Sequence, residues 1–108
     1  LLILLDFYLE GQLTLETIVD KTSHSLARIY GIKDRGFIRE DYWADLVLID
    51  LDKTTTVTKD NLLYECAWSP FEGKTFNSMI NKTFINGETV YDNGKLLSQP
   101  SGKRIEFL

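Results

Sequence analysis

A run of four aliphatic residues, 46–49, lies between Asp45 and Asp50 and constrains the fold more than any other feature of this 108-residue chain. The run does not alternate between apolar and polar side chains, so a strand built from it needs cover on both faces. We therefore expect residues 44–50 to form a central, buried strand. A shorter strand over residues 36–41 is predicted to lead into it, beginning at the conformationally permissive Gly36.

Three short helices are predicted before these strands. The first covers residues 1–10, carries a broad apolar face and ends at Gly11. Thr14 is the expected N-cap of a second helix that runs to about Lys21, and Ser23 is the expected N-cap of a third. After Asp34 the pattern changes from helical to extended, which divides the chain into a helical unit, 1–34, and a β-rich unit, 35–108. The predicted fold class is α+β.

The segments that follow the central strand are less regular. Residues 53–59 are β-branched and polar, as in an exposed or edge segment. Residues 62–66 fit one helical turn or a strand equally well. Residues 68–73 are predicted to be an irregular packed loop, because Pro70 moves its predecessor out of the helical region and a glycine ends the segment.

The sharpest local signal is the pair Asn86-Gly87, which suits a two-residue type I′ turn because both positions need positive φ. It predicts a hairpin over residues 81–91, with Phe84 opposite Thr89 and Thr83 opposite Val90. Similar turn chemistry over residues 92–94 predicts a third strand over 95–97. A polar connection begins at residue 98, and residues 104–108 alternate as in a short edge strand.

Three segments, in their order along the chain, resemble the carboxyl-terminal end of amidohydrolase-superfamily enzymes. They are Ala27-Arg28-Ile29-Tyr30-Gly31, Arg35-Gly36-Phe37-Ile38 and Ala44-Asp45-Leu46-Val47-Leu48-Ile49-Asp50. Two later segments are similar to the matching run of dihydroorotases and related cyclic-amide hydrolases, namely Ser69-Pro70-Phe71-Glu72-Gly73 and Thr83-Phe84-Ile85-Asn86-Gly87-Glu88-Thr89-Val90-Tyr91. The resemblance covers residues 9–97. It implies that residues 1–34 come from the end of a (β/α)8 barrel and that residues 35–108 belong to a mostly antiparallel small β-sandwich.

The resemblance also implies a parent enzyme of the dihydroorotase type, which hydrolyses dihydroorotate reversibly to N-carbamoyl-aspartate in pyrimidine biosynthesis and uses zinc. An allantoinase or a hydantoinase (dihydropyrimidinase) is the near alternative. A free-standing β-rich binding module is the alternative from another class. A barrel of about 250 residues does not fit in this chain, and the apolar start over residues 1–5 is typical of a segment from a longer protein.

The residues that could do chemistry are few, because the chain has one His and one Cys. A zinc-dependent hydrolase needs several His and carboxylate ligands. We therefore expect no catalytic, cofactor-binding or metal-binding residue here, no zinc bound by this segment and no activity of the segment alone. His24 is expected to face solvent or cap a helix, and Cys66 is expected to be a buried structural thiol.

The remaining polar candidates are also predicted to be structural. Asp45 and Asp50 are five residues apart, which places them on opposite strand faces, so we interpret them as strand end-caps. The arginines Arg35 and Arg39 are expected to be solvated or ion-paired. Glu72 is assigned to loop packing. Relatives often have Gly where this chain has Asp41 and Ala67, so a requirement for positive φ there would strain the backbone.

Charge and composition limit the classes of partner that we expect for this chain. The net charge of −4 and the scattered basic residues argue against a nucleic-acid surface, which needs clustered Lys and Arg. The apolar start is interrupted by Asp6 and is far shorter than the roughly 20 residues that span a membrane, so no membrane role is expected. The single cysteine is consistent with a cytoplasmic setting. The expected partners are the missing barrel of the same protein and, for the isolated segment, a second copy.

Overall fold

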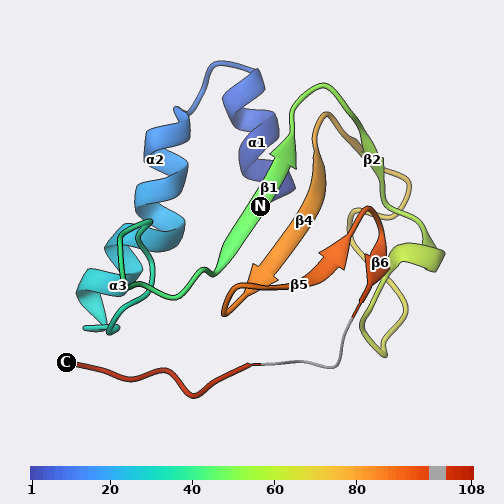
Figure 1. Ribbon diagram of the computed structural model, residues 1–108. Helices are drawn as coiled ribbons and strands as arrows, with labels where there is room; N and C mark the ends of the chain where they lie inside the picture. Colours follow the sequence, from blue (N-terminus) through green and yellow to red (C-terminus); the bar gives the residue numbers. More distant parts are fainter. Residues whose placement is uncertain (98–101) are drawn as a thin grey trace.

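The computed structural model describes residues 1–97 and 102–108, so part of the predicted polar connection after residue 97 lies outside the described residues. Helices come first in the chain and antiparallel strands follow (Figure 1), which confirms the α+β class. The helices are α1 (Leu2–Leu9), α2 (Leu15–Val19), the π-helical turn η1 (Asp20–His24), α3 (Ser25–Ile29) and the short 3-10 helix η2 (Lys59–Asn61). Within the part of the chain that the structure describes, no helix is long and apolar enough to cross a bilayer.

One of the two predicted N-caps is confirmed and the other is wrong. The Thr14 hydroxyl accepts a hydrogen bond from the Thr17 amide at 3.2 Å, so Thr14 is the N-cap of α2. Ser23 does not cap a third helix. It lies inside η1, which joins α2 to α3 without a break, and the Thr22 hydroxyl donates to the Ile18 carbonyl at 2.7 Å across this turn. The helical segment therefore runs continuously from Leu15 to Ile29.

The main sheet has four antiparallel strands in the order β1-β4-β5-β6. A separate two-stranded sheet pairs β2 with β3, which confirms an extended segment near residues 55–56. The strands are β1 (Leu46–Asp50), β2 (Thr55–Thr56), β3 (Thr75–Phe76), β4 (Met79–Ile85), β5 (Glu88–Asp92) and β6 (Lys95–Leu96).

The strand β1 is not central or buried, which contradicts the prediction for residues 44–50. Among the described strands it pairs with β4 alone and therefore forms an edge of the sheet (Figure 1). Val47, Leu48 and Ile49 are 43%, 49% and 36% exposed. The apolar run requires cover on both faces, and the described residues do not supply that cover.

No strand forms over residues 36–41, so that prediction is wrong. Three residues in this neighbourhood have positive φ, Asp34 at 54°, Gly36 at 81° and Asp41 at 64°, which is incompatible with an extended strand. Gly36 also approaches α3 closely, because a Cβ placed on it would lie 2.6 Å from the Cβ of Ala27. The segment is a loop held against the helix, and only a glycine fits at that contact.

The hairpin around Asn86-Gly87 is confirmed, with φ of 53° and 86° at the two turn residues. Phe84 pairs with Thr89 as predicted. Thr83 pairs with Tyr91 and not with Val90, because the register shifts between Thr83 and Phe84.

The second turn, at Asn93-Gly94, leads into β6 and completes the predicted meander. The end of the chain does not form an edge strand as predicted. It makes a single antiparallel bridge, Ile32 to Phe107, and returns to the end of the helical segment.

Residues 62–66 form neither a helical turn nor a strand. They follow η2 as an irregular segment, and the loop over residues 68–73 is also irregular, as predicted. Its packing is limited, because Trp68 is 61% exposed while Phe71 makes an edge-to-face contact with Phe76 at 5.7 Å.

The buried core is small, and part of it lies where α1 contacts β3. The apolar side chains buried among the described residues are Leu5, Ile18, Ala27, Phe76 and Val90. Asp6 is also buried, and its carboxylate accepts a hydrogen bond from the Asn77 amide at 2.9 Å. The first helix is thus joined to the β-rich unit by apolar packing and by one buried polar contact. The division near residue 34 remains a prediction.

Candidate functional site

Metal-ligating side chains are dispersed in this fold. Across residues 1–97 and 102–108, no group of three or more His, Cys, Asp or Glu side chains could hold a metal ion. His24 makes no side-chain capping bond to α3, and its ring stacks on Phe37 with the ring centroids 4.4 Å apart. The prediction that His24 faces solvent or caps a helix is therefore replaced by a packing role against the loop.

Cys66 is exposed, which contradicts the prediction of a buried thiol. Ala67, the next residue, has a φ of 52°, and this left-handed turn keeps the chain at the surface. Its neighbours Leu63 and Trp68 are exposed as well. The Sγ atom lies 3.9 Å from the Trp68 carbonyl oxygen, which is a weak contact.

A polar group joins Arg35, Asp45 and Asn86. The Arg35 guanidinium pairs with the Asp45 carboxylate and also donates to the Asn86 side-chain oxygen at 2.7 Å. The second Asp45 oxygen accepts a hydrogen bond from the backbone amide of Asn86 at 2.8 Å. The Arg35 side chain is only 11% exposed. Asp45 therefore ties the start of β1 to the tip of the β4–β5 hairpin, a structural role close to the predicted end-cap.

Asp50 at the other end of β1 also has a local structural role. Its carboxylate accepts a hydrogen bond from the Asp52 amide at 2.9 Å and lies 3.6 Å from the Lys53 ammonium. The hydrogen bond from the Asp52 amide, with the nearby Lys53 charge, lowers the pKa of Asp50 from its ordinary value. The two aspartates thus hold separate ends of the strand and do not converge on one reacting group.

Arg39 lies over two aromatic rings in the loop after Gly36. Its guanidinium carbon is 4.4 Å from the Phe37 ring centroid and 5.6 Å from that of Tyr42. With His24 also stacked on Phe37, these contacts hold the loop on the helical segment. Glu72 is exposed in the turn between residues 70 and 73.

Asp41 and Ala67, the two positions at which the resemblance led us to expect glycine, have left-handed backbone, with φ of 64° and 52°. The strain is larger at Ala67, since Asp tolerates this region better than Ala.

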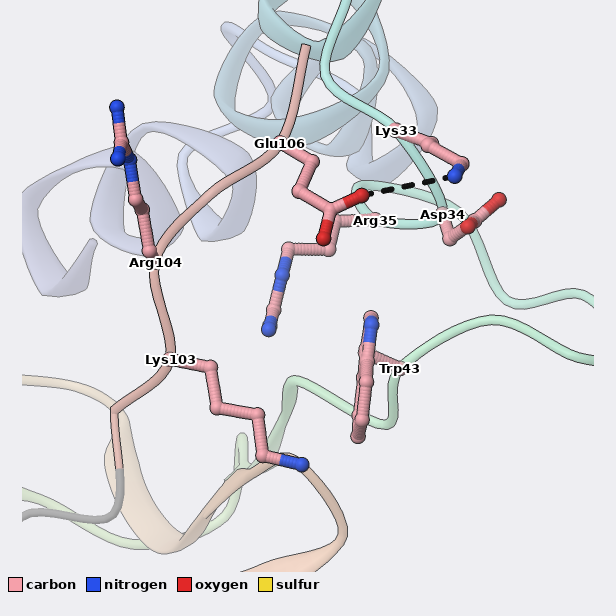
Figure 2. Close-up of a pocket in the computed structure, with 7 residues that line it drawn as sticks. All are labelled: Lys33, Asp34, Arg35, Trp43, Lys103, Arg104 and Glu106. Carbon is pink, nitrogen blue, oxygen red and sulfur yellow. Dashed lines mark ion pairs between the residues drawn. The ribbon is translucent and has the colours of Figure 1, made fainter.

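A pocket with mostly charged lining residues lies between the loop at residues 33–35 and the C-terminal segment, and its cavity volume is about 220 Å³. Figure 2 shows the Arg35 guanidinium and the Lys103 ammonium directed toward its interior, beside the Trp43 ring. Lys103 lies 4.0 Å from the Trp43 ring centroid, and Glu106 pairs with Lys33 at 3.5 Å. Sequence reasoning did not identify this pocket, because residues 33–43 and 103–106 are far apart in the chain.

Comparison with known proteins gives consistent relatives. Residues 7–91 match the Amidohydrolase family. An allantoinase from Desulfitobacterium hafniense is 36% identical over 98 residues, which are 91% of this chain and 22% of that protein. A dihydroorotase from Pyrococcus furiosus is 33% identical over 103 residues, which are 95% of this chain and 25% of that protein.

A solved structure supports the same relationship. The L-hydantoinase (dihydropyrimidinase) from Arthrobacter aurescens superposes with a TM-score of 0.75 at 28% identity, covering 83% of this chain and 20% of that one. The chain therefore spans only 20–25% of the length of these relatives.

Proposed function

Because the chain belongs to the Amidohydrolase family, we propose that it is the carboxyl-terminal part of a cyclic amidohydrolase whose catalytic residues lie outside these 108 residues. The observation that carries this proposal is the match of 83% of the chain to one fifth of the L-hydantoinase structure. The relatives are an allantoinase, a dihydroorotase and a hydantoinase, and these are all enzymes that act on cyclic amides. A common reaction class is the simplest reading of the set.

Within this class we propose a dihydroorotase as the parent enzyme. The support is the segment Ser69-Pro70-Phe71-Glu72-Gly73 together with the hairpin over residues 83–91, and the 95% coverage of this chain by the dihydroorotase from Pyrococcus furiosus. Allantoinase is the second candidate, favoured by the higher identity of 36%. A hydantoinase is favoured by the structural superposition.

The role we propose for this segment is structural. Residues 35–108 would supply strands to a small β-sandwich, and residues 1–34 would pack on the barrel that carries the active site. The exposed faces of β1 support this arrangement, since an edge strand with three exposed aliphatic residues is suited to packing against further protein. The contacts of Asp6 with the Asn77 amide and the Lys74 ammonium would then help to hold the two parts in one orientation.

Zinc in the parent enzyme is part of the proposal, and the present residues do not fit a zinc site. Zinc sites use three or four His, Cys or carboxylate ligands at short range, and the described residues contain no such group. We therefore assign no catalytic step to this chain. Any metal would be held by residues of the barrel.

The test is to express the complete protein that contains this segment and to assay dihydroorotate, allantoin and a hydantoin side by side. Hydrolysis of dihydroorotate with much the highest kcat/KM supports the dihydroorotase assignment, and preference for another ring reassigns the substrate. Absence of activity on all three would contradict the cyclic amidohydrolase proposal. Elemental analysis of the 108-residue chain alone should find no stoichiometric zinc, and one tightly held zinc per chain would contradict the structural role.

The proposal from another class, a free-standing β-rich binding module, makes a different prediction. A module would unfold cooperatively as a monomer and would leave no large apolar surface exposed. Dye binding to exposed apolar surface, compared between the 108-residue chain and the complete protein, separates the two. Equal, low binding by both would favour the module.

A further inference from the structure

The C-terminal segment is held against the loop at residues 33–35 by backbone hydrogen bonds. The Lys33 amide donates to the Glu106 carbonyl at 2.9 Å, and the Leu108 amide donates to the Gly31 carbonyl at 2.7 Å. These bonds flank the antiparallel bridge described above, so the segment is fixed at several successive residues. Both walls of the pocket between the loop and this segment therefore belong to the chain itself.

Trp43 forms a further side of the pocket. Its backbone amide donates to the Asp34 carbonyl at 3.0 Å, which holds it beside the loop. Two cations lie over its ring, with the Lys103 ammonium 4.0 Å and the Arg35 guanidinium carbon 5.4 Å from the ring centroid. The ring attracts both cations, and Figure 2 shows them directed into the space beside it. The two cations therefore converge on one small volume.

The charges around this volume leave one positive charge without a carboxylate partner. The charged lining residues are Lys33, Arg35, Lys103 and Arg104, which are basic, and Asp34 and Glu106, which are acidic. Glu106 pairs with Lys33, and Arg35 pairs with Asp45. The Arg104 and Asp34 side chains have opposite charges, and both point away from Trp43 in Figure 2. Among the described residues, no carboxylate lies within ion-pairing distance of Lys103.

A carboxylate matches this single surplus charge better than a phosphate does. A carboxylate carries one negative charge at neutral pH, whereas a phosphate group carries close to two. The Glu106 carboxylate in the lining would repel the second charge. The two terminal nitrogens of Arg35 donate to Asp45 and Asn86, and a guanidinium has five N–H groups, so donors remain for a ligand. The cavity of about 220 Å³ has room for a small molecule that carries a carboxylate.

We propose that this pocket binds a small monocarboxylate whose oxygens accept charge-assisted hydrogen bonds from the Arg35 guanidinium and the Lys103 ammonium. The bound molecule would connect the C-terminal segment to the loop at residues 33–35. This inference does not depend on the substrate of the proposed enzyme. A ligand of this size makes few contacts, so a Kd of roughly 1–10 mM is expected, and added salt should weaken binding.

The fluorescence of Trp43 is the first test. A Trp68→Phe background leaves Trp43 as the only tryptophan, and its emission should change saturably on titration with propionate. Propionamide has the same shape without the charge and should cause no saturable change. Inorganic phosphate should bind more weakly than propionate. No saturable response to propionate, an equal response to propionamide, or tighter binding of phosphate would overturn the proposal.

Substitution of the unpaired cation is the second test. Lys103→Gln should raise the propionate Kd about tenfold, because it removes a charge-assisted hydrogen bond, and Lys103→Arg should retain binding. Lys95→Gln is the matched control, since it removes the same charge at an exposed position of β6 outside the pocket and should leave the Kd unchanged. Equal weakening by both glutamine variants would show a response to net charge alone and would overturn the proposal. Circular dichroism checks that each variant is folded.

The complete protein that contains this segment provides the third test. Isothermal titration calorimetry with propionate should detect a site that Lys103→Gln weakens and Lys95→Gln does not. Binding of propionate among the catalytic residues of a parent enzyme would not depend on Lys103, so the two kinds of site are separated. Binding that depends on Lys103 in the 108-residue chain but is missing from the complete protein would mean that other parts of the enzyme fill the pocket, which would overturn the proposal.

Discussion

The carboxylate of Asp6 accepts a hydrogen bond from the backbone amide of Asn77 at 2.9 Å, although 71 positions separate the two residues. Asp6 lies on α1 and Asn77 lies between β3 and β4, so this contact joins the first helix to the start of the longest strand. The Lys74 ammonium lies 3.9 Å from the other carboxylate oxygen. A buried acceptor with these partners fixes where the helix meets the sheet.

Replacing Asp6 tests this contact. Asp6→Ala should lower the free energy of unfolding by about 1–3 kcal/mol, because the Asn77 amide loses its acceptor in a buried place. Asp6→Asn keeps an acceptor oxygen and should cost less. Urea unfolding followed by circular dichroism measures both, with Glu40→Ala at an exposed loop position as the control. An Asp6→Ala loss no larger than that of the control would show that the contact is not stabilising.

The Asn86-Gly87 turn gives a second prediction. A Cβ at Gly87 would have nothing within 4 Å, so a substitution there reports backbone strain without steric overlap. Gly87→Val should lower the unfolding free energy by about 1 kcal/mol or more, since φ is 86° and a β-branched residue resists it. Gly102→Val is the matched control, because that site is equally open and lacks a positive φ. The same thermal midpoint for both variants would refute the assigned cause.

Introducing glycine at either of two positions should raise the free energy of unfolding of the chain. Ala67 has a φ of 52°, and changing it to Gly should relieve strain of about 1–2 kcal/mol, from which the extra backbone entropy of glycine in the unfolded chain is subtracted. Asp41→Gly should gain less, because Asp tolerates positive φ. Chemical denaturation should therefore rank Ala67→Gly above Asp41→Gly. The reverse order would indicate that the Asp41 side chain carries the strain.

The lowered pKa of Asp92 predicts that the stability of the folded chain depends on pH. The hydrogen bond from the Lys82 ammonium, at 2.9 Å, lowers the pKa of Asp92 from its ordinary value. A hydrogen bond from the side-chain amide of Asn93 lowers this pKa further. A lowered folded-state pKa contributes stability that is present above the unfolded value, about 3.9, and is lost as the pH falls through the folded value. Asp92→Asn should therefore destabilise the hairpin at neutral pH and have no effect at strongly acidic pH.

The measurement is denaturant unfolding from pH 7 downward, with NMR titration of the side-chain carboxyl groups. Glu65→Gln, in an exposed turn, serves as the control. A difference between wild type and Asp92→Asn that stays constant across this range would contradict an origin in the Asp92 charge.

Features decided by neighbours in the chain could be predicted from the sequence. The Thr14 cap depends on an oxygen meeting an amide three residues later, and the Asn86-Gly87 turn depends on two residues that accept positive φ. The resemblance identified Asp41 and Ala67 as positions where a requirement for positive φ would strain the backbone, and both residues have positive φ. Each of these depends on chemistry within a few residues.

Features decided by distant residues could not be read in the same way. The apolar run of β1 correctly indicated a need for cover, but the sequence does not say which protein surface supplies it. The register shift that moves Tyr91 opposite Thr83 depends on the whole sheet. Cys66 was expected to be buried because cysteines usually are, while its exposure follows from the local path of the loop. The pocket beside Trp43 brings together segments that have no sequence proximity.

The π-helical turn η1 determines how insertions and deletions are tolerated in the first third of the chain. A π turn accommodates one residue more than an α turn, and each residue of an α-helix advances the direction of the side chains by about 100°. Deleting one residue between Asp20 and His24 would change the π turn into an α turn, and because an α turn holds about one residue fewer, the side chains of α3 would keep nearly the same direction and Ala27 would stay against Gly36. A one-residue deletion should therefore be tolerated better in residues 20–24, which include no buried side chain, than in the α-helical parts of the segment from Leu15 to Ile29.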